Sequence, residues 1–401
     1  MAVPTAHSLI HYACFIAAIA LGDLHRTILS TPFSICLMYQ PLHLGFLGRL
    51  TLLTGIISIP SWASGQAVRT IANVVQPVES QALTKILFGS CIKQDRPMPI
   101  LQTIVQQHPD LFIFLGDNIY ADTVDMNQMR AKYARLNANL SFKQLIQSIP
   151  VMATWDDHDY GANDAGADYS RRAESEQIFL DHWGEPAGTA RRTRPGVYDA
   201  KIFGPPGKRV QVILLDTRYF RGPLTKGERR VGGPYVPSAM PDVTMLGDQQ
   251  WRWLDAQLKQ PAELRIIASS IQCVAEAAGQ ETWSNLPKQR QQLFDRIANN
   301  GANGVVILSG DRHWAELSVT RMQTSYPIYD LTSSSLNQIH ARGTPTENQY
   351  RALPKTYHLE NYGAILIDWE KANPEIHLQI LDQSGTPQIE KILRLSELQK
   401  H

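Results

Sequence analysis

Short apolar runs alternate with longer amphipathic stretches along most of the chain after about Gln81. Apolar runs of this length, bounded by turn residues, are typical of strands buried on both faces of a sheet. We expect such strands at residues 85–89, 111–114, 151–155, 266–270 and 305–308. The helical period of apolar positions predicts helices at residues 99–107, 125–137, 142–148, 174–183, 247–258 and 288–299.

Other segments favour antiparallel strands. Residues 197–203 and 209–215 flank the turn sequence GPPG (204–207), which predicts a hairpin. The tail after Leu317 also alternates between apolar and polar residues, and we expect antiparallel strands at 326–331, 364–368 and 376–381. Buried strands flanked by helices, with antiparallel pairs mixed in, indicate an α/β fold in which two packed sheets are covered by helices: a four-layer α/β/β/α sandwich.

Two polar stretches interrupt this pattern, and we expect both to be surface loops. Residues 156–169 are rich in Gly, Asp and Asn. This stretch is too polar for a core and too long for a simple turn, so it is a candidate functional loop. Residues 223–245 are rich in Gly and Pro and predict a second surface loop.

The first 65 residues differ in composition from the rest. They contain two apolar runs, at 12–21 and 50–59, and a single acidic residue, Asp23. Arg49 precedes the second run and small residues follow it, as in a secretory signal peptide. Neither run reaches the length of about 18 residues that would span a bilayer.

We therefore expect residues 1–65 to be a leader. The signal peptide would occupy 38–65, starting at Met38 and cleaved near Ala63. An uncleaved N-terminal anchor is the alternative. Residues 66–401 would form a single globular domain outside the cytoplasm, periplasmic or extracellular, with membrane contact only through the leader.

Composition allows a large core and argues against nucleic-acid binding. The chain has 401 residues, of which 43% are hydrophobic, and a formal net charge of +1. Because no basic tract stands out, we expect no sequence-specific nucleic-acid partner. After the leader the chain has two cysteines, Cys91 and Cys273. One disulfide between them is an open option in an oxidising compartment, although Cys91 has a competing role.

Metal-ligand residue types follow four of the predicted strands. Asp117 comes directly after the 111–114 strand and its glycine break, with Tyr120 close behind. This places a carboxylate at the carboxyl end of a core strand, where loops of α/β sheets converge on ligands. Thiolate, phenolate and imidazole suit a transition metal, whereas carboxylates suit a hard cation. The mixture predicts two unlike metals that share one carboxylate. The other candidates at strand ends are Cys91, Asp156, Asp157, His158, Asp311 and His313.

Six motifs together carry a family resemblance: GSC (89–91), GDNIYAD (116–122), WDDHDYGANDAG (155–166), LLDTRYFR (214–221), SGDRHWAE (309–316) and NYG (361–363). The chain resembles the calcineurin-like metallophosphoesterases and, within that superfamily, the alkaline phosphatase D family, from Leu83 to about Asp368. The resemblance implies the sandwich fold and a metal-dependent phosphoric ester hydrolase, a phosphatase or phosphodiesterase.

The resemblance also implies two ligand sets that share Asp117. The first set, typical of trivalent iron, is Cys91, Asp117, Tyr120 and His313. The second set has only oxygen ligands, which suit calcium better than zinc or copper, and is Asp117, Asp157 and Asp311. The implied cofactor is a binuclear centre of Fe³⁺ and one or two Ca²⁺, with Mn²⁺, Mg²⁺ and Zn²⁺ as alternatives. Asp156 is either a ligand or a partner that supports one.

Other residues of the motifs are expected to handle protons and phosphate. We expect His158 to act as the general acid toward the leaving oxygen. Asn163, on the same loop, and Arg312 are candidate phosphate contacts. Arg218 is either a further phosphate contact or a structural partner of Asp216, because Arg is the natural bidentate partner of both groups.

The sequence therefore predicts an exported binuclear phosphatase or phosphodiesterase that hydrolyses phosphate esters by metal-activated water. The alternative is a catalytically weak, metal-stabilised extracellular protein that binds phosphate esters. The presence of His158 argues against that alternative. Haloperoxidase-like oxidation at the metal is a third and more distant hypothesis.

Overall fold

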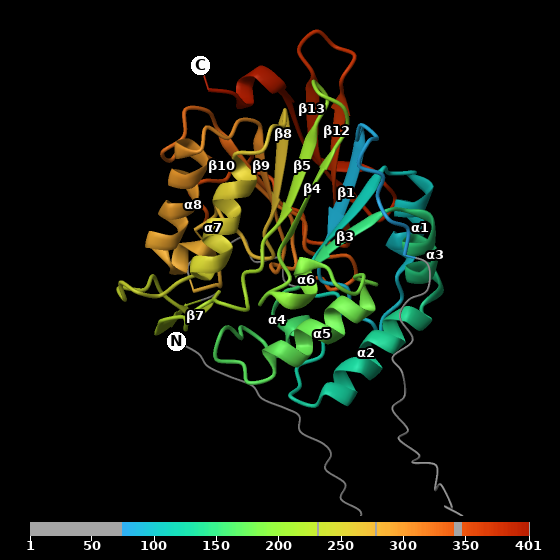
Figure 1. Cartoon of the computed structure of the whole chain (residues 1–401), viewed down its shortest axis with the longest axis vertical. Coiled ribbons are helices and arrows are strands. Elements are labelled where there is room, and N and C mark those ends of the chain that lie inside the picture. The colour runs from blue at the N-terminus through green and yellow to red at the C-terminus, as the bar shows by residue number, and fades with distance from the viewer. Residues whose placement is uncertain (1–73, 231, 277–278, 341–346, 401) are drawn as a thin grey trace, which may run out of the picture. The chain divides into compact units, whose positions relative to one another are not determined.

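The computed structural model describes residues 74–230, 232–276, 279–340 and 347–400 (Figure 1). All of them fall in one compact unit. The expected leader at 1–65 lies outside the described residues. Within the described ranges, no helix is both long enough and apolar enough to cross a membrane.

One six-stranded sheet has the order β14-β13-β12-β1-β2-β3. Its three first strands, β1 (Lys85–Gly89), β2 (Leu111–Leu115) and β3 (Val151–Thr154), are parallel. The other half is antiparallel and consists of β12 (Asn361–Asp368), β13 (Glu375–Asp382) and β14 (Pro387–Arg394). The sheet is therefore mixed, with the parallel strands from the start of the domain beside the antiparallel tail.

The second six-stranded sheet has the order β10-β11-β9-β8-β5-β4. Its four central strands are parallel: β5 (Val210–Leu214), β8 (Leu264–Ala268), β9 (Val305–Ser309) and β11 (Ile328–Thr332). The edge strands β4 (Asp199–Phe203) and β10 (Glu316–Thr320) pair antiparallel with their neighbours.

Helices cover the outer face of each sheet (Figure 1). Beside the first sheet lie α1 (Pro99–Gln106) and α3 (Leu140–Ser148). The helices α2 (Met126–Ala138) and α5 (Arg172–His182) belong to the same apolar cluster and lie below the strands in Figure 1. Beside the second sheet lie α7 (Gly247–Leu258) and α8 (Pro287–Asn299). Their ends follow local signals: α1 and α8 begin with proline, and the Asp125 side chain accepts hydrogen bonds from the first backbone N–H groups of α2.

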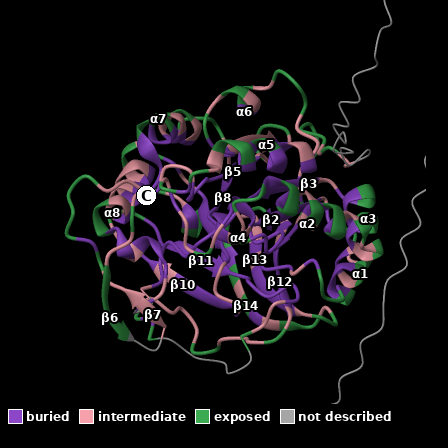
Figure 2. Ribbon diagram, turned by 90° about the horizontal axis from the view of Figure 1, so that it is seen from below, coloured by how far each residue is buried: buried purple, intermediate pink, exposed green. Residues whose placement is uncertain are grey.

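The β2 strand shows why polar residues do not alternate with apolar ones in the predicted strands. Leu111, Ile113 and Leu115 belong to the large core cluster that includes apolar residues of both sheets, and Phe112 and Phe114 belong to the cluster under α1 to α3. Both faces of the strand are buried, as the purple centre of Figure 2 shows. The four-layer α/β/β/α sandwich expected from the sequence is confirmed.

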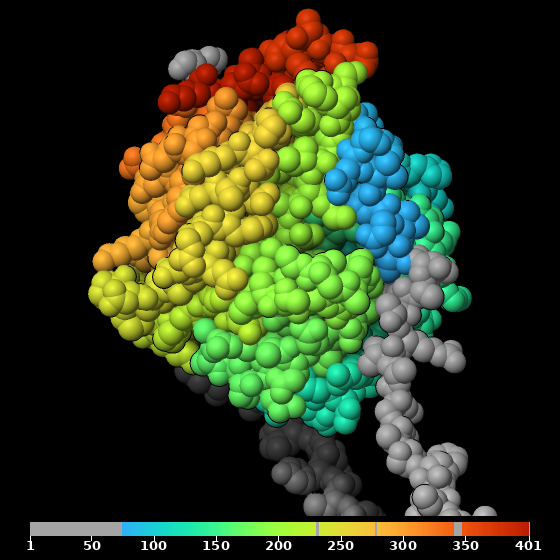
Figure 3. All heavy atoms as spheres, in the orientation of Figure 1, coloured from blue at the N-terminus to red at the C-terminus, as the bar shows by residue number. Residues whose placement is uncertain are grey.

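The structure corrects the sequence prediction in three places. The polar stretch 156–169 begins with a short helix, α4 (Asp157–Tyr160). The stretch 223–245 contains a hairpin of β6 (Lys226–Arg230) and β7 (Gly233–Tyr235), at the lower left of Figure 3. In the tail, β11 runs parallel to β9 because it enters the second sheet instead of the antiparallel half of the first.

Besides α4, β6 and β7, two further strands, one further short helix and two 3₁₀ turns had no counterpart in the prediction. The strands are β10 and β14, the helix is α6 (Ala190–Thr193), and the turns are Trp283–Asn285 and Leu395–Leu398.

Candidate metal centre

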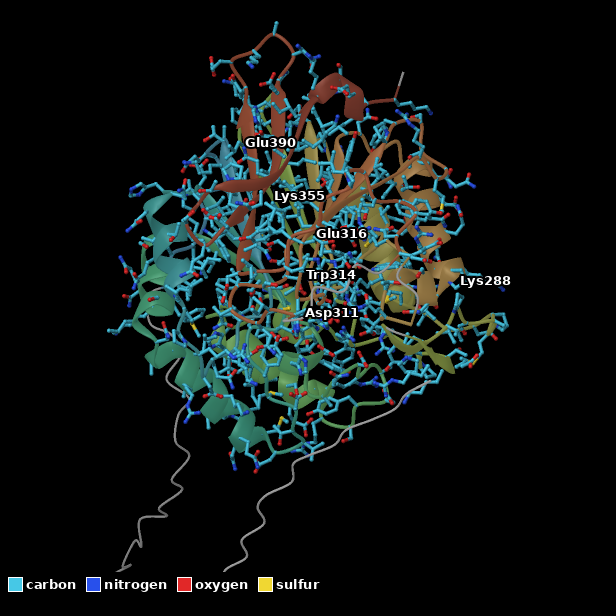
Figure 4. All side chains as sticks on the ribbon, turned by 180° about the vertical axis from the view of Figure 1, so that it is seen from behind. Lys288, Asp311, Trp314, Glu316, Lys355 and Glu390 are labelled. Carbon is cyan, nitrogen blue, oxygen red and sulfur yellow. The ribbon has the colours of Figure 1, made fainter. Side chains whose placement is uncertain are left out.

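The carboxyl ends of β1, β2, β3 and β9 converge on one place, although they come from both sheets. Each strand end carries a donor residue: Cys91 after β1, Asp117 after β2, Asp157 after β3 and Asp311 after β9. Figure 4 labels Asp311 and Trp314 at this end of the strands. The topology thus brings together residues that are more than 200 positions apart in the sequence.

A first group of donor atoms surrounds Asp117. The donor atoms of Cys91, Asp117 and His313 all lie within 4.8 Å of one another. The Tyr120 phenol lies 3.2 Å from Asp117 Oδ2 and 3.1 Å from His313 Nε2. Cys91 Sγ lies 3.4 Å from the same Asp117 oxygen. One thiol, one phenol, one imidazole and one carboxylate therefore face a common point.

A second group contains only carboxylates and again includes Asp117. Its members are Asp117, Asp156, Asp157 and Asp311, whose oxygens lie within 4.8 Å of one another. The structure thus places Asp156 among the donor residues. Its Oδ1 accepts hydrogen bonds from Ser270 Oγ at 2.6 Å and Arg218 Nε at 2.7 Å.

A third group extends the second and was missed by sequence reasoning. Donor oxygens of Asp157, Asp164 and Glu281 lie within 4.8 Å of one another. Asp164 is on the polar loop that the sequence marked as functional, so its composition was a usable signal. Glu281 is in the segment between β8 and α8 and has no local signal, because only the folded chain brings it to the site.

Several of the donor residues share a left-handed backbone conformation. Among the described residues, eight that are not glycine have a positive φ, and six of those belong to this region: Cys91 (60°), Asp117 (51°), Asp122 (45°), Asp164 (55°), Asp311 (68°) and His313 (58°). This conformation costs a residue with a side chain about 1–2 kcal/mol and concentrates at functional sites. The strand ends turn sharply enough to aim their side chains inward.

The electrostatics of the centre are unfavourable without a cation. Burial, reinforced by Cys91, raises the pKa of Asp117 well above its usual range. Burial also raises the pKa of the Cys91 thiol, and raises that of Asp156 to about 7 in spite of Arg218. Burial would likewise raise the pKa of Asp157, but Arg218 and His158 lower it. Several acids thus compete for negative charge in one buried space.

The donor set fits a pair of metal ions. Among the described residues, nothing donates a hydrogen bond to the buried oxygens Asp117 Oδ1 and Asp156 Oδ2. Buried carboxylate oxygens normally have a partner, and a cation at this point would supply one. The thiol, phenol and imidazole of the first group suit a transition metal, and the oxygens of the second group suit a hard cation.

His158 lies beside the centre and forms a further donor group with Asp117 and Asp157, because one of its ring nitrogens lies within 4.8 Å of their oxygens. Its Nδ1 lies 2.7 Å from Asp122 Oδ1, its ring centroid lies 4.3 Å from that of Tyr120, and its side chain is 16% exposed. Burial alone would lower the pKa of His158, but the carboxylate of Asp117 and the hydrogen bond to Asp122 raise it to about 10. Because Asp122 engages Nδ1, Nε2 is the nitrogen left for a substrate.

Asn163 and Arg312 differ in how close they come to the donor groups. Asn163 is exposed on the loop between Asp157 and Asp164. The Arg312 side chain is 9% exposed and pairs with the carboxylate of Asp311. Arg312 therefore lies against a donor residue, whereas Asn163 lies at the surface.

Arg218 requires a correction as a phosphate contact. Its side chain is 0% exposed, and its Nε and Nη1 donate hydrogen bonds of 2.7 Å to Asp156 and Glu281. A guanidinium that is enclosed and already paired with two carboxylates has no face for a substrate. The sequence also left open that Arg218 is a structural partner of Asp216. The two residues do interact, but through the Arg218 backbone, whose N–H donates to Asp216 Oδ1 at 2.9 Å.

The two cysteines of the described residues, Cys91 and Cys273, are both free and buried. The disulfide that the sequence left open is therefore not formed. Cys273 has no place in the donor groups of the described residues.

Most of the chain matches a known protein family. Residues 86–390 match the PhoD-like phosphatase family. The chain belongs to this family. The matched range of this chain contains every residue of the donor groups described above.

Alkaline phosphatase D of Bacillus subtilis (strain 168) is 25% identical to the PhoD-like chain over 286 residues. The match covers 60% of this chain and 48% of that protein, so the chain spans about half the length of the curated relative.

A solved structure with a TM-score above 0.5 shows the same fold. A structure of PhoD has a TM-score of 0.62 at 17% identity, and the match covers 80% of this chain and 70% of that one. GAP50, the anchor in the inner membrane complex of Plasmodium, has a TM-score of 0.49 at 12% identity, with coverage of 78% and 89%. The first likeness supports the sandwich fold, and the second is too distant to bear on function.

Proposed function

We propose that this chain is a metal-dependent phosphoric ester hydrolase, a phosphatase or phosphodiesterase with a binuclear centre. The observation that carries the proposal is the position of Asp117, which belongs both to the group with Cys91 and His313 and to the group with Asp157 and Asp311. A carboxylate common to two donor groups is the arrangement that bridges two metals. Membership of the PhoD-like phosphatase family supports the same reaction class.

The proposed ligands of the first metal are Cys91, Asp117, Tyr120 and His313, and those of the second are Asp117, Asp157 and Asp311. The first set matches Fe³⁺ and the second matches Ca²⁺, with a further Ca²⁺ as an option and Mn²⁺, Mg²⁺ and Zn²⁺ as alternatives. When bound, such metals supply Lewis-acid stabilisation of phosphoryl oxygens and activate water for attack.

The remaining side chains of the site act on the substrate. His158 carries the proton for the leaving oxygen on Nε2, while Asp122 fixes the orientation of the ring through Nδ1. Arg312, next to Asp311, and Asn163 contact the phosphate. Buried Arg218 holds Asp156 and Glu281 in place and does not contact the substrate.

We also propose that the protein is exported and that residues 66–401 form the catalytic domain. This part of the proposal rests on the composition of residues 1–65. The N-terminal sequence of the mature protein, purified from its own host, tests it. A start near residue 64 is expected, and a mature chain that retains residues 38–65 in the cytoplasm would contradict export.

The activity is tested with the purified protein and chromogenic phosphate mono- and diesters, with and without a chelator. We expect hydrolysis that the chelator abolishes and that Asp117→Asn lowers by at least about 100-fold, because this substitution weakens both donor groups. Full activity of Asp117→Asn would refute the proposal. Binding of the ester without product release would instead support the phosphate-ester binding protein.

A further inference from the structure

One buried carboxylate next to the donor groups is not among them. Asp159 is 0% exposed and lies in the short helix α4. Its Oδ1 accepts hydrogen bonds from the backbone N–H groups of Asp156 at 2.7 Å and Asp117 at 3.2 Å. Its Oδ2 accepts from the backbone N–H of Asn118 at 3.2 Å and from Asn118 Nδ2 at 2.5 Å. Both carboxylate oxygens of Asp159 thus accept hydrogen bonds, from the loop after β2 and from the loop after β3.

These two loops carry the donor residues that follow β2 and β3, and they touch through their backbones. Gly116 has a φ of 106°, and a Cβ at this position would lie 2.5 Å from Asp156 Cβ. The close approach leaves no room for a side chain between the loops. It also turns their N–H groups inward, where buried donors need an acceptor.

Asn118 links the same contact to the sheet. Besides Asp159, its Nδ2 donates to the carbonyl oxygen of Thr154 at 2.9 Å, at the end of β3. One carboxylate and one amide therefore tie the end of β2 to the end of β3. In this arrangement, carboxylate oxygens of Asp117 and Asp157 lie within 4.8 Å of each other.

We propose that Asp159 is a positioning residue of the metal centre. Its carboxylate holds residues 116–118 against residues 156–157 and sets the separation of Asp117 and Asp157 before a metal binds. The proposal rests on the proposed metal site but not on turnover. Hydrogen bonds that orient metal ligands typically account for 10–100-fold in metal affinity.

Asp159→Asn tests this role with almost no change in shape. The amide replaces one accepting oxygen by an NH₂ group that faces N–H donors, so the loops lose part of their attachment. We expect the dissociation constant for Mn²⁺, measured by electron paramagnetic resonance of free Mn²⁺ in titrations of the metal-stripped protein, to rise 10–100-fold.

Asp110→Asn is the matched control, at the opposite end of β2. Asp110 Oδ2 accepts from Thr84 N at 2.7 Å, Thr84 Oγ1 at 2.9 Å and Lys85 N at 2.9 Å, so it ties the start of β2 to the start of β1, at the other end of the strands from the donor groups. We expect its Mn²⁺ dissociation constant to stay within twofold of that of the unmodified protein. Equal weakening by both substitutions, or none by Asp159→Asn, would overturn the proposal.

If Asp159→Asn does not fold, hydrogen exchange on the unmodified protein tests whether the loops are ordered before a metal binds. In the metal-stripped protein, we expect the amides of residues 117, 118 and 156 to be protected as well as those of β2. Fast exchange that slows only after Mn²⁺ is added would show that the metal, and not Asp159, orders the loops. Neither measurement depends on hydrolysis, so both remain informative if the proposed activity fails.

Discussion

The phenol of Tyr235 donates a hydrogen bond of 2.7 Å to Oδ2 of Asp164. Tyr235 ends the β6–β7 hairpin, and Asp164 is in the donor group with Asp157 and Glu281. Burial raises the pKa of Asp164 to about 6, and this hydrogen bond opposes the shift. A surface hairpin that the sequence did not predict thus reaches the candidate metal centre.

Tyr235→Phe removes this hydrogen bond and keeps the ring. We expect kcat/KM for a chromogenic phosphodiester to fall about fivefold, since one hydrogen bond accounts for about 1 kcal/mol. Tyr326→Phe is the control, because that phenol is buried against the Ala302 carbonyl, away from the centre. It should lower stability and leave kcat/KM unchanged. An unchanged kcat/KM for Tyr235→Phe would show that the hairpin does not act on the site.

Arg218→Met tests whether Arg218 is structural. It leaves the buried carboxylates of Asp156 and Glu281 without their partner, so we expect the free energy of unfolding in urea to fall by about 3–5 kcal/mol. Arg209→Met removes a more exposed pair with Glu263, with side chains 24% and 21% exposed, and should lower the free energy of unfolding far less than Arg218→Met does. A raised KM with unchanged stability would instead restore Arg218 as a phosphate contact.

Cys91→Ser tests the proposed iron site. We expect it to lower the iron content per chain, measured by elemental analysis of protein purified from its host, because a hydroxyl is a much poorer ligand than a thiolate. Cys273→Ser is the matched control, a buried free cysteine outside the donor groups of the described residues. Equal iron content in all three proteins would exclude Cys91 as a ligand.

His182 predicts how stability changes with pH. Burial lowers the pKa of His182 from 6.5 to about 3, and neither ring nitrogen has a hydrogen-bond partner among the described residues. Below pH 6.5 the unfolded chain therefore binds a proton that the folded chain does not. Stability falls as pH falls from 6.5 toward 3, by about 1.4 kcal/mol per pH unit from this residue.

His182→Phe should remove that dependence, because the new ring packs against Tyr133 and Trp183 and does not titrate. Urea denaturation at pH 7.5, 5.5 and 4.5 should give a shallower loss of stability than in the unmodified protein. His108→Asn, an exposed histidine with a φ of 49°, is the control and should keep the original slope. The same slope in all three proteins would contradict the assignment.

Much of the fold could be predicted because its signals are local. Apolar runs that are buried on both faces, such as β2, and helix starts such as Pro99 and the Asp125 cap depend on neighbouring residues only. The β6–β7 hairpin was missed because Lys226–Arg230 is polar and because Tyr235 pairs with Gly279 across a long stretch of sequence. A pairing between residues so far apart in the chain produces no local period of apolar positions from which a strand could be predicted.

The candidate site divides in the same way. Cys91, Asp117, Asp157, Asp311 and His313 were found because each follows a strand, and strand ends converge. The roles of Glu281 and Arg218 depend on a buried ion pair between segments that only the folded chain brings together. Asp159 lies in the motif at 155–166, but nothing in the sequence indicates that its oxygens accept hydrogen bonds from backbone N–H groups.

The left-handed backbone at Cys91, Asp117, Asp311 and His313 limits how this centre can be redesigned. Val, Ile and Thr are disfavoured at these positions by their branched Cβ atoms, whatever chemistry they would offer. Asn, Asp, His and Gly tolerate this backbone best. Very few side chains are therefore available for a design that exchanges one metal for another. A thioether or a longer carboxylate would have to adopt the positive φ of the turn.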